Sequence, residues 1–203
     1  MGPHGSAYTF RIRSGVMTGT QAHGTRLLFR MLGLLALAFA LTAAGAWFAG
    51  RYYSARPASD LASQTFFAQK LEIAQGGQLD LSSLRGQVLV VNFWATWCPP
   101  CVEEMPELNA LQQEFQSASP NRVKFIGIGI DSPSNIRQFA AKSSFGYPLL
   151  LGGTTGNEIA RLFGNDKGLL PYTVIIGQDG SMKKSIVGRV RIDALRDQIR
   201  TAL

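Results

Sequence analysis

Residues 88–94 (VLVVNFW) form an almost uninterrupted run of β-forming apolar side chains, which is typical of a strand buried on both faces of a sheet. Residues 98–115 follow after a short gap. They carry an apolar stripe at helical spacing, made of Val102, Met105, Leu108, Leu111 and Phe115. A buried strand that leads directly into an amphipathic helix requires a layered fold, in which helices pack on a sheet.

The chain beyond this pair continues to alternate between strand and helix patterns. We expect strands at 123–130, 149–151, 172–176 and 182–187, and helices at 134–142, around 158–163 and from about residue 192. Ahead of the pair we expect a short strand at 65–71 and a glycine turn at 76–77. This order predicts an α/β fold with a central mixed β-sheet that is flanked by helices on both faces.

Residues 31–50 (MLGLLALAFALTAAGAWFAG) contain no charged side chain. A helix of this length spans the roughly 30 Å hydrocarbon layer of a bilayer. The preceding residues carry basic side chains and no acidic one, namely Arg11, Arg13, Arg26 and Arg30. This bias favours an N-terminus in the cytoplasm and a C-terminal domain on the far side of the membrane.

The expected organisation of the chain has four parts: a disordered cytoplasmic N-terminus (1–26), a transmembrane anchor (27–50), a linker (51–63) and a folded domain (64–203). A cleaved signal peptide is the alternative to an anchor, with an apolar region at 31–42 and a cleavage site at Ala44-Gly45-Ala46. Either alternative exports the folded domain. Met17 is an alternative start to Met1.

The chain has only two cysteines, so a hydrophobic core rather than a disulfide framework must hold the fold. A zinc site would need two further ligands, but both histidines, His4 and His23, precede the apolar run. The net charge of +7 comes partly from the N-terminal arginines, and the other basic residues are scattered rather than arranged in a stripe. We therefore expect no metal, no cofactor and no nucleic acid.

The two cysteines form a C-x-x-C motif, Cys98-Pro99-Pro100-Cys101, between the buried strand and the amphipathic helix. In this context the motif is typical of thioredoxin-like redox chemistry. The dipole and free amides of a helix N-terminus favour the thiolate, which is the attacking species. We expect Cys98 to be the nucleophile and Cys101, one turn further on, to resolve the mixed disulfide. The prolines fit the first helical turn, whose amides lack intrahelical partners.

The segment VVNFWATWCPPCVEEMPEL closely resembles the active-site region of the TlpA/ResA-type family, which comprises membrane-anchored thioredoxin-like thiol–disulfide oxidoreductases of bacteria. The resemblance covers about residues 64–203, including GIGIDSPSNIRQFAAKSSFGYPLLLG and the Leu170-Pro171-Tyr172-Thr173 loop. It implies a thioredoxin-like fold and a single-pass protein of the bacterial inner membrane, with the catalytic domain in the periplasm.

The resemblance also implies roles for individual residues. Pro171 matches the cis-proline of the family, which exposes the backbone of Leu170 for docking a substrate strand; the alternative is an ordinary loop proline. Trp97, Pro99 and Pro100 complete the docking surface that we expect.

Glu104 matches the active-site glutamate of the family, and at three residues after Cys101 it shares a helix face with that cysteine. If its pKa is raised by partial burial, it can accept and return the proton as Cys101 attacks or leaves. The alternative is a solvated helix charge. Thioredoxins usually place an Asp where this chain has Asn92, which cannot shuttle protons.

The expected function is therefore the reduction of disulfides in exported proteins, as in cytochrome c maturation. Electrons would come from a DsbD/CcdA-type membrane donor, because exported compartments are kept oxidising. Alternatively, the same motif forms or isomerises disulfides. A copper-handling metallochaperone is a further alternative, although the chain has no histidine after His23.

Overall fold

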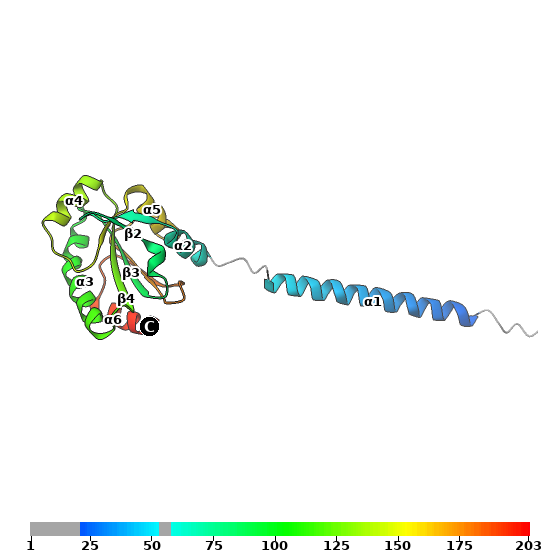
Figure 1. Cartoon of the computed structure of the whole chain (residues 1–203). Coiled ribbons are helices and arrows are strands. Elements are labelled where there is room, and N and C mark those ends of the chain that lie inside the picture. Colours follow the sequence, from blue (N-terminus) through cyan, green and yellow to red (C-terminus); the bar gives the residue numbers. More distant parts are fainter. Residues whose placement is uncertain (1–20, 53–57) are drawn as a thin grey trace, which may run out of the picture. The chain divides into compact units, whose positions relative to one another are not determined.

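The computed structural model describes residues 21–52 and 58–203 of the chain (Figure 1). Its internal contacts divide the chain into two units, Met1–Ser54 and Ala55–Leu203. The described part of the first unit is a single helix, α1 (Gln21–Tyr52), and the second unit contains all the other helices and strands.

Helix α1 contains a 20-residue segment, Phe29–Phe48, that is long and apolar enough to cross a membrane, and its side chains are exposed. A signal sequence near the N-terminus has the same length and composition. The helix begins at Gln21, so residues 21–26 are helical and not disordered as expected. Extending a helix requires less free energy than nucleating one, which explains the earlier start. The expectation of disorder at residues 1–20 lies outside the described residues.

A five-stranded mixed sheet forms the centre of the second unit, in the order β5–β4–β3–β6–β7. Its strands are β3 (Val88–Trp94), β4 (Val123–Gly129), β5 (Leu149–Leu151), β6 (Tyr172–Ile176) and β7 (Met182–Val187). Parallel pairs join β3 to β4 and β4 to β5, whereas β6 runs antiparallel to both β3 and β7. All seven residues of the central strand β3 are buried, as its apolar run predicts. The mixed sheet expected from the sequence is confirmed.

Helices cover both faces of this sheet (Figure 1). They are α2 (Ala58–Phe67), α3 (Pro99–Ala118), α4 (Pro133–Ala141), α5 (Gly153–Leu162) and α6 (Ile192–Ala202). Helix α5 begins five residues earlier than the sequence pattern indicated. The layered arrangement follows from β3, because a strand that is apolar on both sides needs a helical layer on each.

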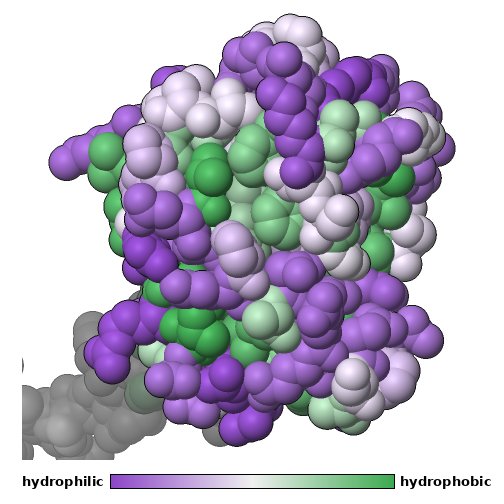
Figure 2. All heavy atoms as spheres, turned by 90° about the vertical axis from the view of Figure 1, so that its left-hand side faces the viewer, coloured by the Kyte–Doolittle hydropathy of each residue, from purple (hydrophilic) through white to green (hydrophobic). Residues whose placement is uncertain are grey.

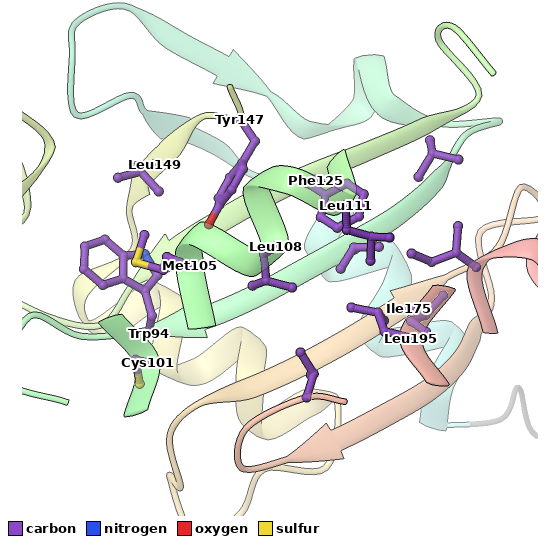
Figure 3. Close-up of a cluster of buried hydrophobic side chains, with 14 of the residues drawn as sticks. Trp94, Cys101, Met105, Leu108, Leu111, Phe125, Tyr147, Leu149, Ile175 and Leu195 are labelled. Carbon is purple, nitrogen blue, oxygen red and sulfur yellow. The ribbon is translucent and has the colours of Figure 1, made fainter. Parts of the chain in front are cut away.

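The side chains of β3 alternate between two hydrophobic clusters. Val88, Val90 and Trp94 pack with α3, α4 and α6 on one face of the sheet. Leu89, Val91 and Phe93 pack with α2 and α5 on the other. Figure 3 shows the first cluster, in which Met105, Leu108 and Leu111 of α3 lie over the sheet.

Two expectations are wrong: the linker does not extend to residue 63, and no strand covers 65–71 as a whole. Residues 58–67 form helix α2, and the first strand, β1, covers only Lys70–Glu72. The buried side chains of α2 recur at helical spacing, at Ala62, Ser63, Phe66 and Phe67. Phenylalanine and threonine favour strands, but the burial of a helical stripe outweighs this weak preference.

A small antiparallel hairpin precedes β3. It consists of β1 and β2 (Gln78–Asp80), and a short 3-10 helix, η1 (Leu81–Leu84), follows it. Ile73 forms a bridge to Leu150, and the Ala74 amide donates to the Leu149 carbonyl oxygen over 2.8 Å. The hairpin segment therefore covers the β5 edge of the main sheet, which would otherwise expose unpaired backbone groups.

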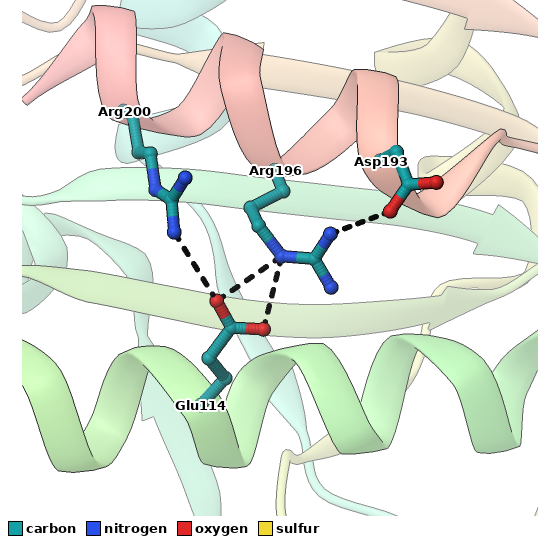
Figure 4. Close-up of polar contacts among 4 residues, drawn as sticks. All are labelled: Glu114, Asp193, Arg196 and Arg200. Atoms are coloured by element: carbon teal, nitrogen blue, oxygen red, sulfur yellow. Dashed lines mark hydrogen bonds and ion pairs between the residues drawn. The ribbon is translucent and has the colours of Figure 1, made fainter.

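Ion pairs join the outer surfaces of α3 and α6 (Figure 4). The Glu114 carboxylate accepts a hydrogen bond from Arg196 Nε at 3.0 Å and lies 3.5 Å from Arg200. Arg196 also contacts Asp193 of its own helix. Exposed ion pairs of this kind contribute little stability individually, so the core carries most of it.

Figure 2 shows one face of the domain, on which hydrophilic side chains predominate and apolar side chains lie between them.

The packing of α2 predicts that Phe66→Ala destabilises the domain by about 3–5 kcal/mol, because the side chain is fully buried and its removal leaves a cavity. Leu61→Ala is the control on the same helix; Leu61 is 58% exposed, so we expect a change within about 0.5 kcal/mol. Urea unfolding of the full chain in detergent, followed by tryptophan fluorescence, measures both. Equal effects of the two substitutions would contradict the packing of α2 against the sheet.

Candidate active site

Cys98 and Cys101 are joined by a disulfide at the N-terminus of α3, with their Cα atoms 5.3 Å apart. Cys98 is the N-cap residue, and Pro99 and Pro100 are the first two helical residues. Cys101 is completely buried, whereas Cys98 keeps 5% of its surface exposed. Cys98 is therefore the more exposed of the two cysteines, and the better placed to meet an external thiol or disulfide.

The two prolines change the electrostatics of this helix N-terminus. Neither has an N–H group, and the amides of Cys101 and Val102 both donate to the Cys98 carbonyl oxygen, over 3.1 and 3.2 Å. The free amides that we expected next to Cys98 are therefore missing from these positions. The macrodipole of the 20-residue helix α3 remains to stabilise a Cys98 thiolate.

Asp131, which follows β4, holds the segment that leads to Cys98. Its carboxylate accepts hydrogen bonds from the hydroxyl and amide of Thr96, and from the Ser132 amide and the Asn135 side chain at 2.6 and 2.8 Å. Burial acts to raise the pKa of Asp131, but these hydrogen bonds outweigh it and lower that pKa. The ionised carboxylate thus ties the approach to the motif to the loop between β4 and α4.

The Leu170–Pro171 peptide bond is cis, as predicted. Tyr172, the first residue of β6, pairs with Phe93 near the end of β3, so Pro171 lies at the end of the sheet from which the chain leads to Cys98. Leu170 is half-buried and packs against the hydrophobic cluster that contains both cysteines. The structure therefore brings the cis-proline loop to the same end of the domain as the motif.

Three large apolar side chains remain exposed at this end of the sheet. Trp97, directly before Cys98, is 65% exposed. Leu169 is 47% exposed, and Val187 of β7, which pairs with Tyr172, is 57% exposed. We predicted Trp97 from the sequence but neither Leu169 nor Val187, because exposure depends on the packing of neighbouring strands.

Glu104 lies on α3 one turn after Cys101 and is completely buried. Its Oε1 accepts a hydrogen bond from Asn92 Nδ2 at 2.8 Å, and its Oε2 accepts one from the Val190 amide at 3.0 Å. Burial raises the pKa of Glu104, although these two hydrogen bonds and the charge of Arg189 oppose the rise. Among the side chains that the structure describes, this is the only buried one of the Asp, Glu, Lys and Arg types.

Arg189 precedes Val190 in the chain and pairs with two carboxylates on the surface of α3, which fixes the Val190 amide next to Glu104. Its guanidinium pairs with the exposed carboxylates of Glu103 at 3.2 Å and Glu107 at 2.6 Å, one on each side of Glu104 in the sequence of α3. Nothing in the sequence pattern pointed to Arg189 or Val190, because these contacts join residues more than 80 positions apart.

Two further polar groups lie in the core near Glu104. Thr173 of β6 is fully buried and accepts a hydrogen bond from Asn92 Nδ2 at 3.1 Å. The Tyr147 hydroxyl is directed toward α3 in Figure 3, and burial together with the charge of Glu104 raises the pKa of this phenol. A polar residue inside an apolar strand usually has a buried partner, so Thr173 could have been identified from the sequence.

No group of three or more His, Cys, Asp or Glu side chains that could hold a metal ion occurs within the described ranges 21–52 and 58–203. The chemically distinctive groups of the site are thus a disulfide and, beneath it on the same helix, a buried carboxyl group. This combination can exchange disulfides and move a proton.

Comparison with known proteins gives consistent results. The family model for the AhpC/TSA family matches residues 62–185, which is more than half of the chain. The thiol-disulfide oxidoreductase ResA of Geobacillus thermodenitrificans is 28% identical over 177 residues, covering 86% of this chain and 94% of the relative. The ResA protein of Bacillus cereus is 27% identical over 178 residues, covering 86% of this chain and 95% of the relative.

A solved structure of a thiol:disulfide interchange protein of the thioredoxin family from Chlorobium tepidum is also similar. It has a TM-score of 0.56 and 27% identity, and the match covers 66% of this chain and 92% of that one. The fold is therefore thioredoxin-like, as the resemblance of the active-site segment indicated. With more than half of its length matched by the family model, the chain belongs to the AhpC/TSA family.

Proposed function

We propose that this thiol–disulfide oxidoreductase reduces disulfides in exported proteins through Cys98 and Cys101. The observation that carries the proposal is the disulfide at the start of α3, in which Cys98 keeps a small exposed surface and Cys101 is completely buried, one turn from a buried carboxyl group. The names of the similar proteins, thiol-disulfide oxidoreductase and thiol:disulfide interchange protein, support the same chemistry.

The proposed reaction has two exchange steps. The Cys98 thiolate attacks a substrate disulfide, so that a mixed disulfide forms and one substrate sulfur leaves as a thiolate. The Cys101 thiolate then attacks the sulfur of Cys98 and releases the second substrate sulfur. The substrate gains two electrons, and the enzyme is left with the Cys98–Cys101 disulfide, the form that the structure has.

Glu104 is the proposed proton acceptor for Cys101. A buried thiol cannot pass its proton to water directly, and Glu104 lies one turn away on the same helix without contact with solvent. A carboxyl group whose pKa is raised by burial can take up the proton as Cys101 attacks and return it when the disulfide is reduced again.

The substrate would dock at the apolar end of the sheet. Trp97, Pro99 and Pro100 border the more exposed cysteine, and the backbone beside the cis Leu170–Pro171 bond is the proposed partner of an extended substrate segment. Leu169 and Val187 extend this surface. An open apolar surface suits a protein substrate better than a small molecule, which would need an enclosing pocket.

The proposed location is the bacterial inner membrane, with α1 as a single-pass anchor and the catalytic domain in the periplasm. The apolar segment Phe29–Phe48 and the basic residues before it support this topology. Regeneration of the dithiol in an oxidising compartment requires an electron source, and we propose a membrane donor of the DsbD/CcdA type. Cytochrome c maturation is the proposed pathway.

The different exposure of the cysteines predicts different phenotypes for their serine variants. Cys98→Ser should abolish disulfide reduction, whereas Cys101→Ser should still attack and then accumulate a mixed disulfide, because resolution is lost. An insulin-reduction assay measures the first effect, and non-reducing gel electrophoresis detects the trapped complex. Trapping by Cys98→Ser instead would reverse the proposed roles.

The proposed role of Glu104 predicts that replacing it slows the second step, in which Cys101 attacks the mixed disulfide. We expect Glu104→Gln to slow the release of substrate from the mixed disulfide by about 100-fold or more, the usual contribution of general acid–base catalysis. Glu158→Gln is the control, because Glu158 is an exposed glutamate on another helix, α5, and is not part of the contacts around Glu104. Stopped-flow measurement of substrate release from a preformed mixed disulfide tests both. Equal rates for the two variants would refute the role of Glu104.

The direction of electron flow predicts the redox state of the enzyme in cells. A reductase should be found mainly as the dithiol, and it should become oxidised when its membrane donor is deleted. Acid quenching followed by alkylation with a mass-tagged reagent reads this state as a gel shift. An enzyme that is mainly oxidised in cells containing the donor would instead support disulfide formation or isomerisation.

A further inference from the structure

Three buried polar side chains from three different elements meet beneath the active-site helix. Asn92 of β3 is directly opposite Thr173 of β6 in the antiparallel register, and Glu104 of α3 lies above them. Asn92 Nδ2 is 2.8 Å from Glu104 Oε1 and 3.1 Å from Thr173 Oγ1. Both hydrogen atoms of the amide are therefore donated to oxygen atoms.

The other half of the Asn92 amide is unpaired. Its Oδ1 is buried and has no hydrogen-bond partner among the residues that the structure describes. A buried acceptor without a partner is unfavourable, so an arrangement of this kind calls for an explanation. The orientation of the amide suits an ionised Glu104, because a carboxylate only accepts hydrogen bonds.

A protonated Glu104 would not suit this orientation. The Val190 amide donates to Oε2 at 3.0 Å, which keeps Oε2 as the acceptor and places the acid proton on Oε1. The O–H group on Oε1 would then face the N–H group of Asn92, and two donors would be in contact. A half-turn of the amide removes the conflict, since Oδ1 then accepts from Glu104. The Thr173 hydroxyl, which can rotate, donates to Oδ1 as well.

We propose that Asn92 is a positioning residue whose amide reverses its orientation when Glu104 gains or loses its proton, with Thr173 exchanging the roles of acceptor and donor. The amide keeps two hydrogen bonds, to Glu104 and Thr173, in each state, and its other end faces away from both residues in each, so Glu104 stays in place near Cys101 whether it is charged or neutral. An aspartate at position 92 could not do this, because its carboxylate cannot donate a hydrogen bond.

This inference rests on the proposed role of Glu104 as the proton acceptor of Cys101. A proton acceptor acts efficiently when little else moves during the transfer. Rotation of one amide and one hydroxyl leaves the backbone of β3, β6 and α3 unchanged. Thioredoxins usually place a proton-carrying Asp where this chain has Asn92. Here Asn92 instead supports the proton transfer by the neighbouring Glu104.

The ionisable groups around Glu104 lie on α3 and in the segments before α6 and β5, whereas β3 and β6 face it with the neutral side chains of Asn92 and Thr173. Cys101 and Glu107 lie on its own helix, Arg189 lies in the loop before α6, and Tyr147 precedes β5. In the disulfide form neither cysteine titrates, and the Tyr147 phenol is held neutral by burial. A pH response at Asn92 in the oxidised protein can therefore be separated from cysteine chemistry.

Nuclear magnetic resonance of the oxidised full chain in detergent micelles tests the proposal. Selective 15N labelling of asparagine gives six side-chain signals, and 13C labelling of glutamate follows the carboxyl groups. We expect the Asn92 signal to shift with the same midpoint pH as Glu104. The nuclear Overhauser effect between the Asn92 amide protons and the Thr173 side chain should be strong above that pH and weaken below it.

Asn165 provides the internal control. It is also buried, but its Nδ2 and Oδ1 are both paired with the backbone of Leu169 at 2.9 Å, so its signal should not follow Glu104. Glu104→Gln provides the second control, because a glutamine side chain cannot ionise and the Asn92 signal should then become independent of pH. An unchanged Overhauser effect across the Glu104 midpoint, or an unchanged Asn92 response in Glu104→Gln, would overturn the proposal.

The experiment separates this inference from the proposed function on which it rests. Coupled titration of Asn92 and Glu104, combined with a normal rate of substrate release in Glu104→Gln, would support the amide switch and refute the proton transfer. Slow release in Glu104→Gln with an Asn92 amide that does not respond would support the proton transfer and refute the switch.

Discussion

The buried carboxyl group of Glu104 is the constraint on which the arrangement of the site depends. A carboxyl group completely removed from solvent needs hydrogen-bond donors, and here they come from β3 through Asn92 and from the loop before α6 through Val190. The ion pairs of Arg189 on the surface hold the Val190 amide in place. The hydrogen bond from Asn92 to Thr173 in the core holds the Asn92 amide. One polar group thus joins the active-site helix to the centre of the sheet and to the C-terminal part of the domain.

The start of α3 shows a second balance of forces. A helix N-terminus favours an anion, but two prolines remove the first amide donors and leave mainly the helix dipole to act on Cys98. The same prolines restrict the backbone between the two cysteines. The site therefore combines a modest local field with rigid positioning, and Asp131 adds to the rigidity by holding Thr96 just before the motif.

Much of the fold could be predicted because its main signals are local. The apolar run of β3, the stripe of α3 and the short strands β5 to β7 are visible as periodicities within a few residues of each other. Helix α2 was missed because Thr65, Phe66 and Phe67 favour strands in isolation, and only packing within the hydrophobic cluster that α2 shares with α5 and the sheet makes their helical stripe favourable. The early start of α1 was missed because residues 21–26 lack apolar periodicity of their own.

By itself, the sequence determined the chemistry of this protein: two cysteines in one motif at a strand–helix junction, a carboxyl group one turn later, a proline before a buried strand and an apolar N-terminal segment. Only the tertiary structure decided which of these groups are buried and which partners they have. The partners of Glu104 are 12 and 86 residues away in the chain, and the exposed Val187 reaches the site through strand pairing. Burial and long-range hydrogen bonds depend on how distant segments pack, so no local pattern of residues can encode them.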